Sequence, residues 1–132
     1  MKKFVNDPAK FVPEFMAGVL AANADLLEGN LEFQMIKRKT IDASKVAIVQ
    51  GSGSGHEPAH VRAVGPGMLT AACQGPVFAA PPVDACYETI EAAATDAGVL
   101  VLVNNYQGDR MAWDMRGPLV RGPRPPVRHR SR

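Results

Sequence analysis

The segment Val46–Pro58, with the sequence VAIVQGSGSGHEP, constrains this chain more than any other part of it. It starts as an apolar run of strand length and continues into three glycines within five positions, followed by His56. Glycine lacks a Cβ, so the backbone can turn sharply here and approach a ligand closely. An imidazole directly after the glycines is suited to proton transfer near neutral pH. The segment therefore predicts a strand, Val46–Val49, and a ligand-binding loop, 51–57, at the edge where open α/β sheets bind ligands. The alternative is a tight strand-to-helix turn that binds no ligand.

Helices and strands are expected to alternate along the chain. The apolar spacing predicts helices over 13–23, 58–64 and 81–95, and strands over 31–36, 46–49, 68–73 and 99–103. The run Val99–Val103 is continuously apolar, which is typical of a buried parallel strand. This order predicts an α/β fold based on a parallel sheet. The polar loops 51–57 and 104–109 both follow strands, so we expect them to open at the same edge.

Length and composition indicate one domain that resides in the cytoplasm. The chain has 132 residues, of which 46% are hydrophobic, enough for one packed core. The first residues lack the apolar region of a signal peptide, and no run is long enough to span a membrane. The two cysteines, Cys73 and Cys86, lack metal-ligand spacing and are expected to be reduced thiols.

The net charge of +2 is unevenly distributed. The last segment, 116–132, holds six arginines, four prolines and no acidic residue, whereas 1–115 has a net charge of −4. A segment of this composition cannot pack a core and is expected to be disordered. One interpretation is a frameshift product; the alternative is a basic tail for an acidic partner or nucleic acid. We favour the first, and predict neither a nucleic-acid nor a membrane partner.

Two familiar motifs can be set aside. His56-Glu57-Pro58-Ala59-His60 matches the zinc-protease pattern H-E-x-x-H, but Pro58 opposes the continuous helix that this pattern needs. The glycines fit neither the Walker A pattern nor G-x-G-x-x-G. We therefore predict no metal site and no nucleotide-phosphate anchor in this chain.

Asp109 has two interpretations. After Gly108 it could cap the following helix, which is the more common role of an aspartate in such a position. Alternatively, it could face His56 across the sheet edge and form with it a general acid–base pair on a substrate hydroxyl. Ser52 and Ser54 could be nucleophiles, but no G-x-S-x-G elbow surrounds them.

Three segments together resemble a known family. They are GSGSGHEP at 51–58, GPGMLTAACQGPVF at 65–78 and NNYQGD at 104–109. These motifs, in this order and spacing, resemble the K subunit, or DhaK domain, of dihydroxyacetone (glycerone) kinases, and the resemblance covers about residues 1–115. It implies an α/β domain that corresponds to the incomplete N-terminal part of a DhaK-type domain.

The resemblance also implies a function. In this family the K subunit binds a short ketose, chiefly dihydroxyacetone, and is expected to form a homodimer. A separate L subunit or domain carries ATP or ADP with magnesium. In phosphotransferase-linked systems a further protein supplies phosphate from phosphoenolpyruvate. We therefore expect a ketose kinase subunit of glycerol metabolism that binds no cofactor itself.

Carried over by position, the resemblance implies roles for particular residues. Gly53, Ser54, Gly55 and His56 match the segment that holds the substrate. His56 matches an acid/base histidine, and Asp109 matches a second acid/base next to the hydroxyl that accepts phosphate. Asn104 lies at a substrate-contacting position where dihydroxyacetone-specific members commonly carry lysine, so this chain departs from the family at a residue that bears on the choice of ketose.

The family's K unit is considerably longer than this chain. The histidine that binds the substrate carbonyl covalently has no counterpart here, because nothing around His129 matches it. We therefore expect residues 1–115 to form a truncated ketose-binding domain that is inactive as a kinase on its own. The alternative is a non-catalytic ketose-binding or regulatory module.

Overall fold

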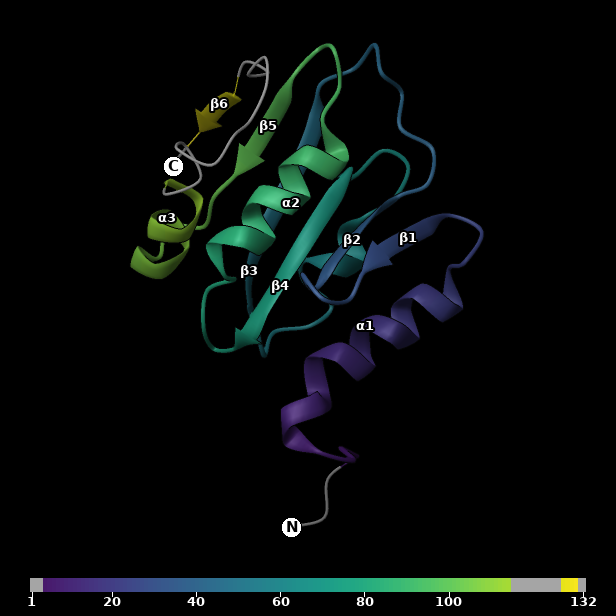
Figure 1. The fold of residues 1–132 in the computed structure, drawn as a ribbon, viewed down its shortest axis with the longest axis vertical. Coiled ribbons are helices and arrows are strands. Elements are labelled where there is room, and N and C mark those ends of the chain that lie inside the picture. The colour runs from purple at the N-terminus through teal and green to yellow at the C-terminus, as the bar shows by residue number, and fades with distance from the viewer. Residues whose placement is uncertain (1–3, 115–126, 131–132) are drawn as a thin grey trace.

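A mixed six-stranded sheet forms the centre of the molecule (Figure 1). The computed structural model describes residues 4–114 and 127–130. In spatial order the strands are β1 (Leu27–Asn30), β2 (Met35–Arg38), β4 (Ala71–Val77), β3 (Ala47–Ser54), β5 (Val99–Leu102) and β6 (Val127–Arg130). The helices are α1 (Phe11–Ala22), α2 (Val83–Ala93) and α3 (Gln107–Asp114), with short 3-10 helices η1 (Pro8–Lys10) and η2 (Val61–Ala63).

The predicted α/β class is confirmed. Strands β4, β3, β5 and β6 run parallel, while β1 and β2 form an antiparallel hairpin at one side of the sheet. Because β3 and β5 are parallel neighbours, the chain leaves both strands at the same edge. The two polar segments that follow these strands therefore lie at one edge, as the sequence predicts.

Helices cover both faces of the sheet. On one face, α2 and α3 pack on a core that includes Val49, Val101 and the fully buried Trp113, and Figure 1 shows α2 over the middle of the sheet. On the other face, α1 contributes the buried Met16 to a second core with Ile36. Successive side chains along a strand point to opposite faces of the sheet, so apolar residues of one strand contribute to both cores.

The single strand predicted over 31–36 is wrong, because the structure has a hairpin there. Strands β1 and β2 flank a turn in which the Glu32 N–H donates to Asn30 Oδ1 at 3.0 Å. Gln34 takes the left-handed conformation, with φ of 48°. The predicted strand thus spans the turn itself, in which the apolar Leu31 is exposed.

The helix predicted over 58–64 is also wrong. Only η2 is helical there, and residues 57–60 form a turn instead. The helices predicted over 13–23 and 81–95 are confirmed as α1 and α2, with ends shifted by up to two residues. The loop predicted over 104–109 is shorter than expected, because α3 already begins at Gln107.

The basic segment 116–132 lies outside the described residues except for β6. These four residues form a strand that pairs with β5, and the disorder expected for the rest of the segment falls outside the described residues. Both cysteines, Cys73 and Cys86, are free and buried. None of the helices in the described part of the chain has the length and apolar character of a membrane span.

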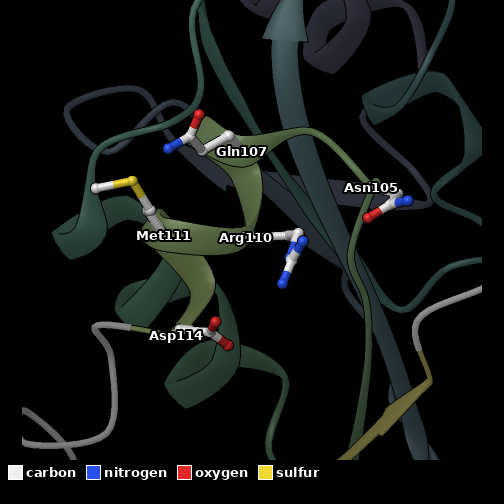
Figure 2. Close-up of a pocket in the computed structure, with 5 residues that line it drawn as sticks. All are labelled: Asn105, Gln107, Arg110, Met111 and Asp114. Carbon is white, nitrogen blue, oxygen red and sulfur yellow. The ribbon is translucent and has the colours of Figure 1, made fainter.

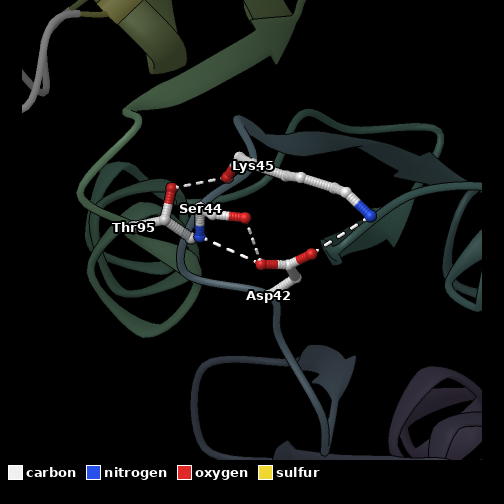
Figure 3. Close-up of polar contacts among 4 residues, drawn as sticks. All are labelled: Asp42, Ser44, Lys45 and Thr95. Carbon is white, nitrogen blue, oxygen red and sulfur yellow. Dashed lines mark hydrogen bonds and ion pairs between the residues drawn. The ribbon is translucent and has the colours of Figure 1, made fainter.

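A polar turn precedes β3 (Figure 3). Asp42 Oδ1 accepts hydrogen bonds from the Ser44 N–H at 3.0 Å and from Ser44 Oγ at 2.6 Å, and Asp42 Oδ2 lies 3.1 Å from Lys45 Nζ. The Thr95 hydroxyl donates to the Lys45 carbonyl at 2.8 Å and ties this turn to the end of α2. The Ser44 hydroxyl and the Lys45 ammonium lower the pKa of Asp42 from 3.8 to about 2.

This low pKa predicts a loss of stability in acid. An acid whose pKa is lower in the folded state stabilises the fold above its unfolded pKa, and this contribution disappears as the pH falls from about 4 to about 2. Asp42→Asn should remove that part of the pH dependence. Urea unfolding midpoints between pH 2 and pH 6 measure it, with the exposed Asp25→Asn as control. Equal pH dependence in the two variants would contradict the role of the turn.

Candidate functional site

Strand β3 is longer than the sequence predicts and includes the glycine-rich segment up to Ser54. The loop predicted over 51–57 is wrong in its first part, since β3 runs to Ser54 and only Gly55, with φ of 117°, leaves extended backbone. Gly51 is needed for packing: a Cβ there would lie 2.4 Å from Cys73 Sγ and 3.1 Å from Trp113 Cζ2. At Gly53 a Cβ would lie 2.7 Å from the Ala79 carbonyl oxygen. Close approach of neighbouring side chains at Gly51 and of neighbouring backbone at Gly53, rather than a turn, thus accounts for these two glycines.

The serines of this segment have different partners. Ser52 Oγ donates to Asp109 Oδ2 at 2.7 Å, and both side chains are buried. Ser54 Oγ donates to the Gly75 carbonyl at 2.7 Å and so ties β3 to β4. Ser54 therefore already uses its only proton within the fold, whereas Ser52 orients a carboxylate.

Asp109 does not cap α3, because it lies inside the first turn of that helix. Its side chain is 3% exposed and points toward β3, as the bond from Ser52 shows. Among the described residues, no hydrogen bond to Asp109 Oδ1 is found, so one carboxylate oxygen is held and the other is free to accept. Burial beside a strand end makes this carboxylate a candidate proton acceptor.

His56 is paired with His60 rather than with Asp109. His56 follows β3 and is exposed, and its Nε2 lies 3.4 Å from His60 Nε2. The two rings meet edge to face, with centroids 5.4 Å apart. His60 was not expected in the site, and its half-buried position is a feature that only the fold reveals. Burial and the neighbouring His56 lower the pKa of His60, and Asp109 opposes this effect only in part.

Asn104 joins the same group from the end of β5. Its Nδ2 lies 3.3 Å from His60 Nε2, and its Oδ1 accepts from Gln50 Nε2 at 3.0 Å. The structure thus brings Asn104 and His56 together through His60. It brings Asp109 to the same sheet edge, but no hydrogen bond links Asp109 to His56 within residues 4–114.

Gln74 holds the loop that follows β3. This fully buried side chain bonds through Nε2 to Glu57 Oε1 and to the Ala59 carbonyl, each at 3.3 Å, and accepts from the His60 N–H at 3.4 Å. The Glu57 carboxylate in turn accepts from the Gly55 N–H at 3.1 Å. Sequence reasoning missed Gln74, although a glutamine within the apolar run at 68–78 was a signal of a buried polar network.

An open hollow of about 530 Å³ lies on the outer side of α3, next to this site (Figure 2). It is lined by Asn105, Gln107, Arg110, Met111 and Asp114. The large apolar side chains of Phe78, Tyr106 and Met111 are exposed and follow β4 or β5 along the chain. Among residues 4–114, no group of three or more metal-ligating side chains occurs.

Comparison with known proteins finds a family match over most of the chain. The model of the Dak1 domain matches residues 17–122. The dihydroxyacetone-binding subunit DhaK of a PTS-dependent dihydroxyacetone kinase from Lactococcus lactis is 45% identical over 114 residues, which cover 86% of this chain and 34% of that subunit. The chain thus spans about a third of the length of this curated relative.

Solved structures agree with this match. A dihydroxyacetone kinase from C. freundii, in complex with AMP-PNP and Mg²⁺, superimposes with a TM-score of 0.80 at 38% identity and covers 89% of this chain and 23% of the enzyme. The dihydroxyacetone kinase operon co-activator Dha-DhaQ superimposes with a TM-score of 0.76 at 31% identity, over 89% of this chain and 36% of the co-activator. Both an enzyme and a co-activator therefore share this fold.

Proposed function

Because this chain belongs to the Dak1 domain family, we propose that it forms the acid–base side of the substrate pocket of a dihydroxyacetone (glycerone) kinase. The observation that carries the proposal is the buried pair of Ser52 and Asp109 at the sheet edge, beside His56 and Asn104. The substrate is a short ketose, which Gly53, Ser54, Gly55 and Asn104 help to hold.

The chemistry follows from the position of Asp109. A primary hydroxyl is a weak nucleophile, so a base that accepts its proton assists attack on the phosphoryl group. Ser52 fixes Asp109 Oδ2, which leaves Oδ1 for the substrate hydroxyl. His56 is the second acid/base group. Positioning and electrostatic stabilisation supply the remainder of the catalysis, as in other phosphoryl transfers.

The phosphate donor is proposed to arrive on a partner. An L-type subunit or domain would carry ATP or ADP with magnesium, either in an ATP-dependent enzyme or in a phosphoenolpyruvate-linked system. The exposed Phe78, Tyr106 and Met111 give the site edge an apolar surface for such a partner. A homodimer is part of the same proposal.

A second candidate is a non-catalytic ketose-binding or regulatory module. The likeness to the co-activator Dha-DhaQ supports it, since that protein shares the fold over most of this chain. Asn104 supports it as well, because it departs from the lysine common at this position in dihydroxyacetone-specific kinases.

A chimera of this chain and a full-length relative, the joined protein, distinguishes the two candidates. Residues 1–114 of this chain would replace the matching segment of the Lactococcus lactis subunit, and phosphorylation of dihydroxyacetone would be assayed with that organism's own partner proteins. We expect activity from the joined protein and none from the isolated chain with the same partners. Ketose binding without phosphorylation would favour the regulatory module, and loss of both in a folded joined protein would overturn the ketose pocket.

A further inference from the structure

Four side chains form a continuous hydrogen-bonded chain at the site. Gln50 Nε2 bonds to Asn104 Oδ1 at 3.0 Å, Asn104 Nδ2 lies 3.3 Å from His60 Nε2, and His60 Nε2 lies 3.4 Å from His56 Nε2. The members come from β3, from the end of β5 and from the loop after β3. Three of them are half-buried, and His56 at the end is exposed.

The direction of donation along this chain follows from the orientation of the Gln50 amide, whose Nε2 faces Asn104 Oδ1. Its NH₂ group can only donate, so Asn104 Oδ1 is the acceptor and Asn104 Nδ2 faces His60. That NH₂ group can also only donate, so His60 Nε2 must accept and carries no proton. A neutral His60 then holds its proton on Nδ1.

The same argument assigns the proton of the His56 ring. His60 Nε2 has one lone pair, which the Asn104 amide and the His56 ring share, and the contact between the two imidazoles is a hydrogen bond only if His56 Nε2 is protonated and donates. A neutral imidazole with a proton on Nε2 has a free lone pair on Nδ1. The lowered pKa of His60, caused first by burial and then by His56, agrees with a neutral acceptor at this position.

We propose that His60 is a positioning residue that fixes the tautomer of His56, so that His56 presents Nδ1 to the substrate as its basic nitrogen. Gln50 and Asn104 set this tautomer from the interior of the fold. The role of the Nδ1 atom toward a ketose rests on the proposed function; the tautomer itself does not. The tautomer of a histidine is set by the hydrogen bond that its other nitrogen makes.

The test measures the ring nitrogens directly. The full chain, labelled with ¹⁵N in its three histidines, would be studied by NMR above the pKa of the imidazoles, where protonated and bare ring nitrogens have well-separated shifts. His56 signals are assigned by their loss in His56→Gln. We expect His56 to be protonated at Nε2 and His60 at Nδ1. A His56 protonated at Nδ1 in the unmodified chain would overturn the proposal.

Two substitutions should reverse the tautomers from different points. Asn104→Asp puts an acceptor beside His60 Nε2, so His60 should be protonated there and His56 should move its proton to Nδ1. Gln50→Glu should do the same by turning the Asn104 amide, so that its oxygen faces His60. Asn105→Asp, the same change at the exposed neighbouring position, is the control and should leave both rings unchanged.

The outcomes separate this inference from the kinase proposal. The spectra are recorded without ketose, so failure of ketose binding would leave the tautomer result intact. If His56 keeps its proton on Nε2 in a folded Asn104→Asp or Gln50→Glu chain, the proposal that Gln50, Asn104 and His60 set its tautomer is overturned, even if the joined protein is an active kinase. If one variant fails to fold, shown by collapse of its amide spectrum, the other variant and the unmodified chain still decide the question.

Discussion

Asp109→Asn is expected to lower kcat for ketose phosphorylation by the joined protein by roughly 10²- to 10⁴-fold, the usual contribution of a general base. Asparagine keeps the shape of the side chain and an oxygen that can accept from Ser52, so the fold should remain intact. The amide cannot accept a proton, and the substrate hydroxyl therefore loses its base. Steady-state kinetics measure the effect, and far-UV circular dichroism checks the fold.

The matched control is Asp96→Asn. Asp96 is an exposed aspartate between α2 and β5, at the opposite edge of the sheet from Asp109. Its substitution should leave kcat within twofold of the unmodified joined protein. If both variants keep the kcat of the unmodified joined protein, Asp109 has no catalytic role. If both lose kcat to the same extent, the assay reports a general effect of charge.

Gly75→Ala is expected to lower the free energy of unfolding by about 1–3 kcal/mol, the usual range for overpacking. An added Cβ would lie 2.4 Å from the Ala79 carbonyl oxygen, 2.6 Å from the Pro81 nitrogen and 2.7 Å from the Ala80 carbonyl carbon. All three atoms belong to the backbone, so no side chain can rotate away. The Gly75 carbonyl also accepts from Ser54, so the change should disturb the strand end that carries the site.

Gly18→Ala provides the opposite result. Gly18 lies exposed in the middle of α1, and nothing lies within 4 Å of an added Cβ. Alanine there should raise the free energy of unfolding by about 0.5–1 kcal/mol, because it restricts the unfolded backbone. Urea unfolding of both variants tests the pair. If the Gly75→Ala variant is as stable as the unmodified protein, the backbone of residues 79–81 can move away from the added Cβ at little cost in free energy.

The sequence predicted elements well where the apolar pattern was clear. The apolar runs behind β3, β5 and α2 gave the α/β class, because a buried parallel strand and a helix with one apolar face each leave a distinct periodicity. Segments without a clear pattern failed instead. The hairpin of β1 and β2 was missed because neither strand alternates buried and exposed residues, so their sequences do not show where the turn lies.

The site shows the same division. His56, Asp109 and Asn104 were predicted from motifs that follow strands, and their arrival at one sheet edge follows from the parallel pairing of β3 and β5. His60 and Gln74 were not predicted as site residues. Their roles depend on contacts across the sheet, and a local pattern does not contain such contacts.

The sequence by itself determined the α/β class, the family and the edge at which the polar groups gather, because these follow from local periodicity and from motifs. Only the tertiary structure decided what the glycines are for and which groups pair. It placed Gly51 and Gly53 against neighbouring atoms, Asp109 against Ser52, and His56 against His60. Such pairings are set by the packing of distant segments, whose distances no local preference of the chain encodes.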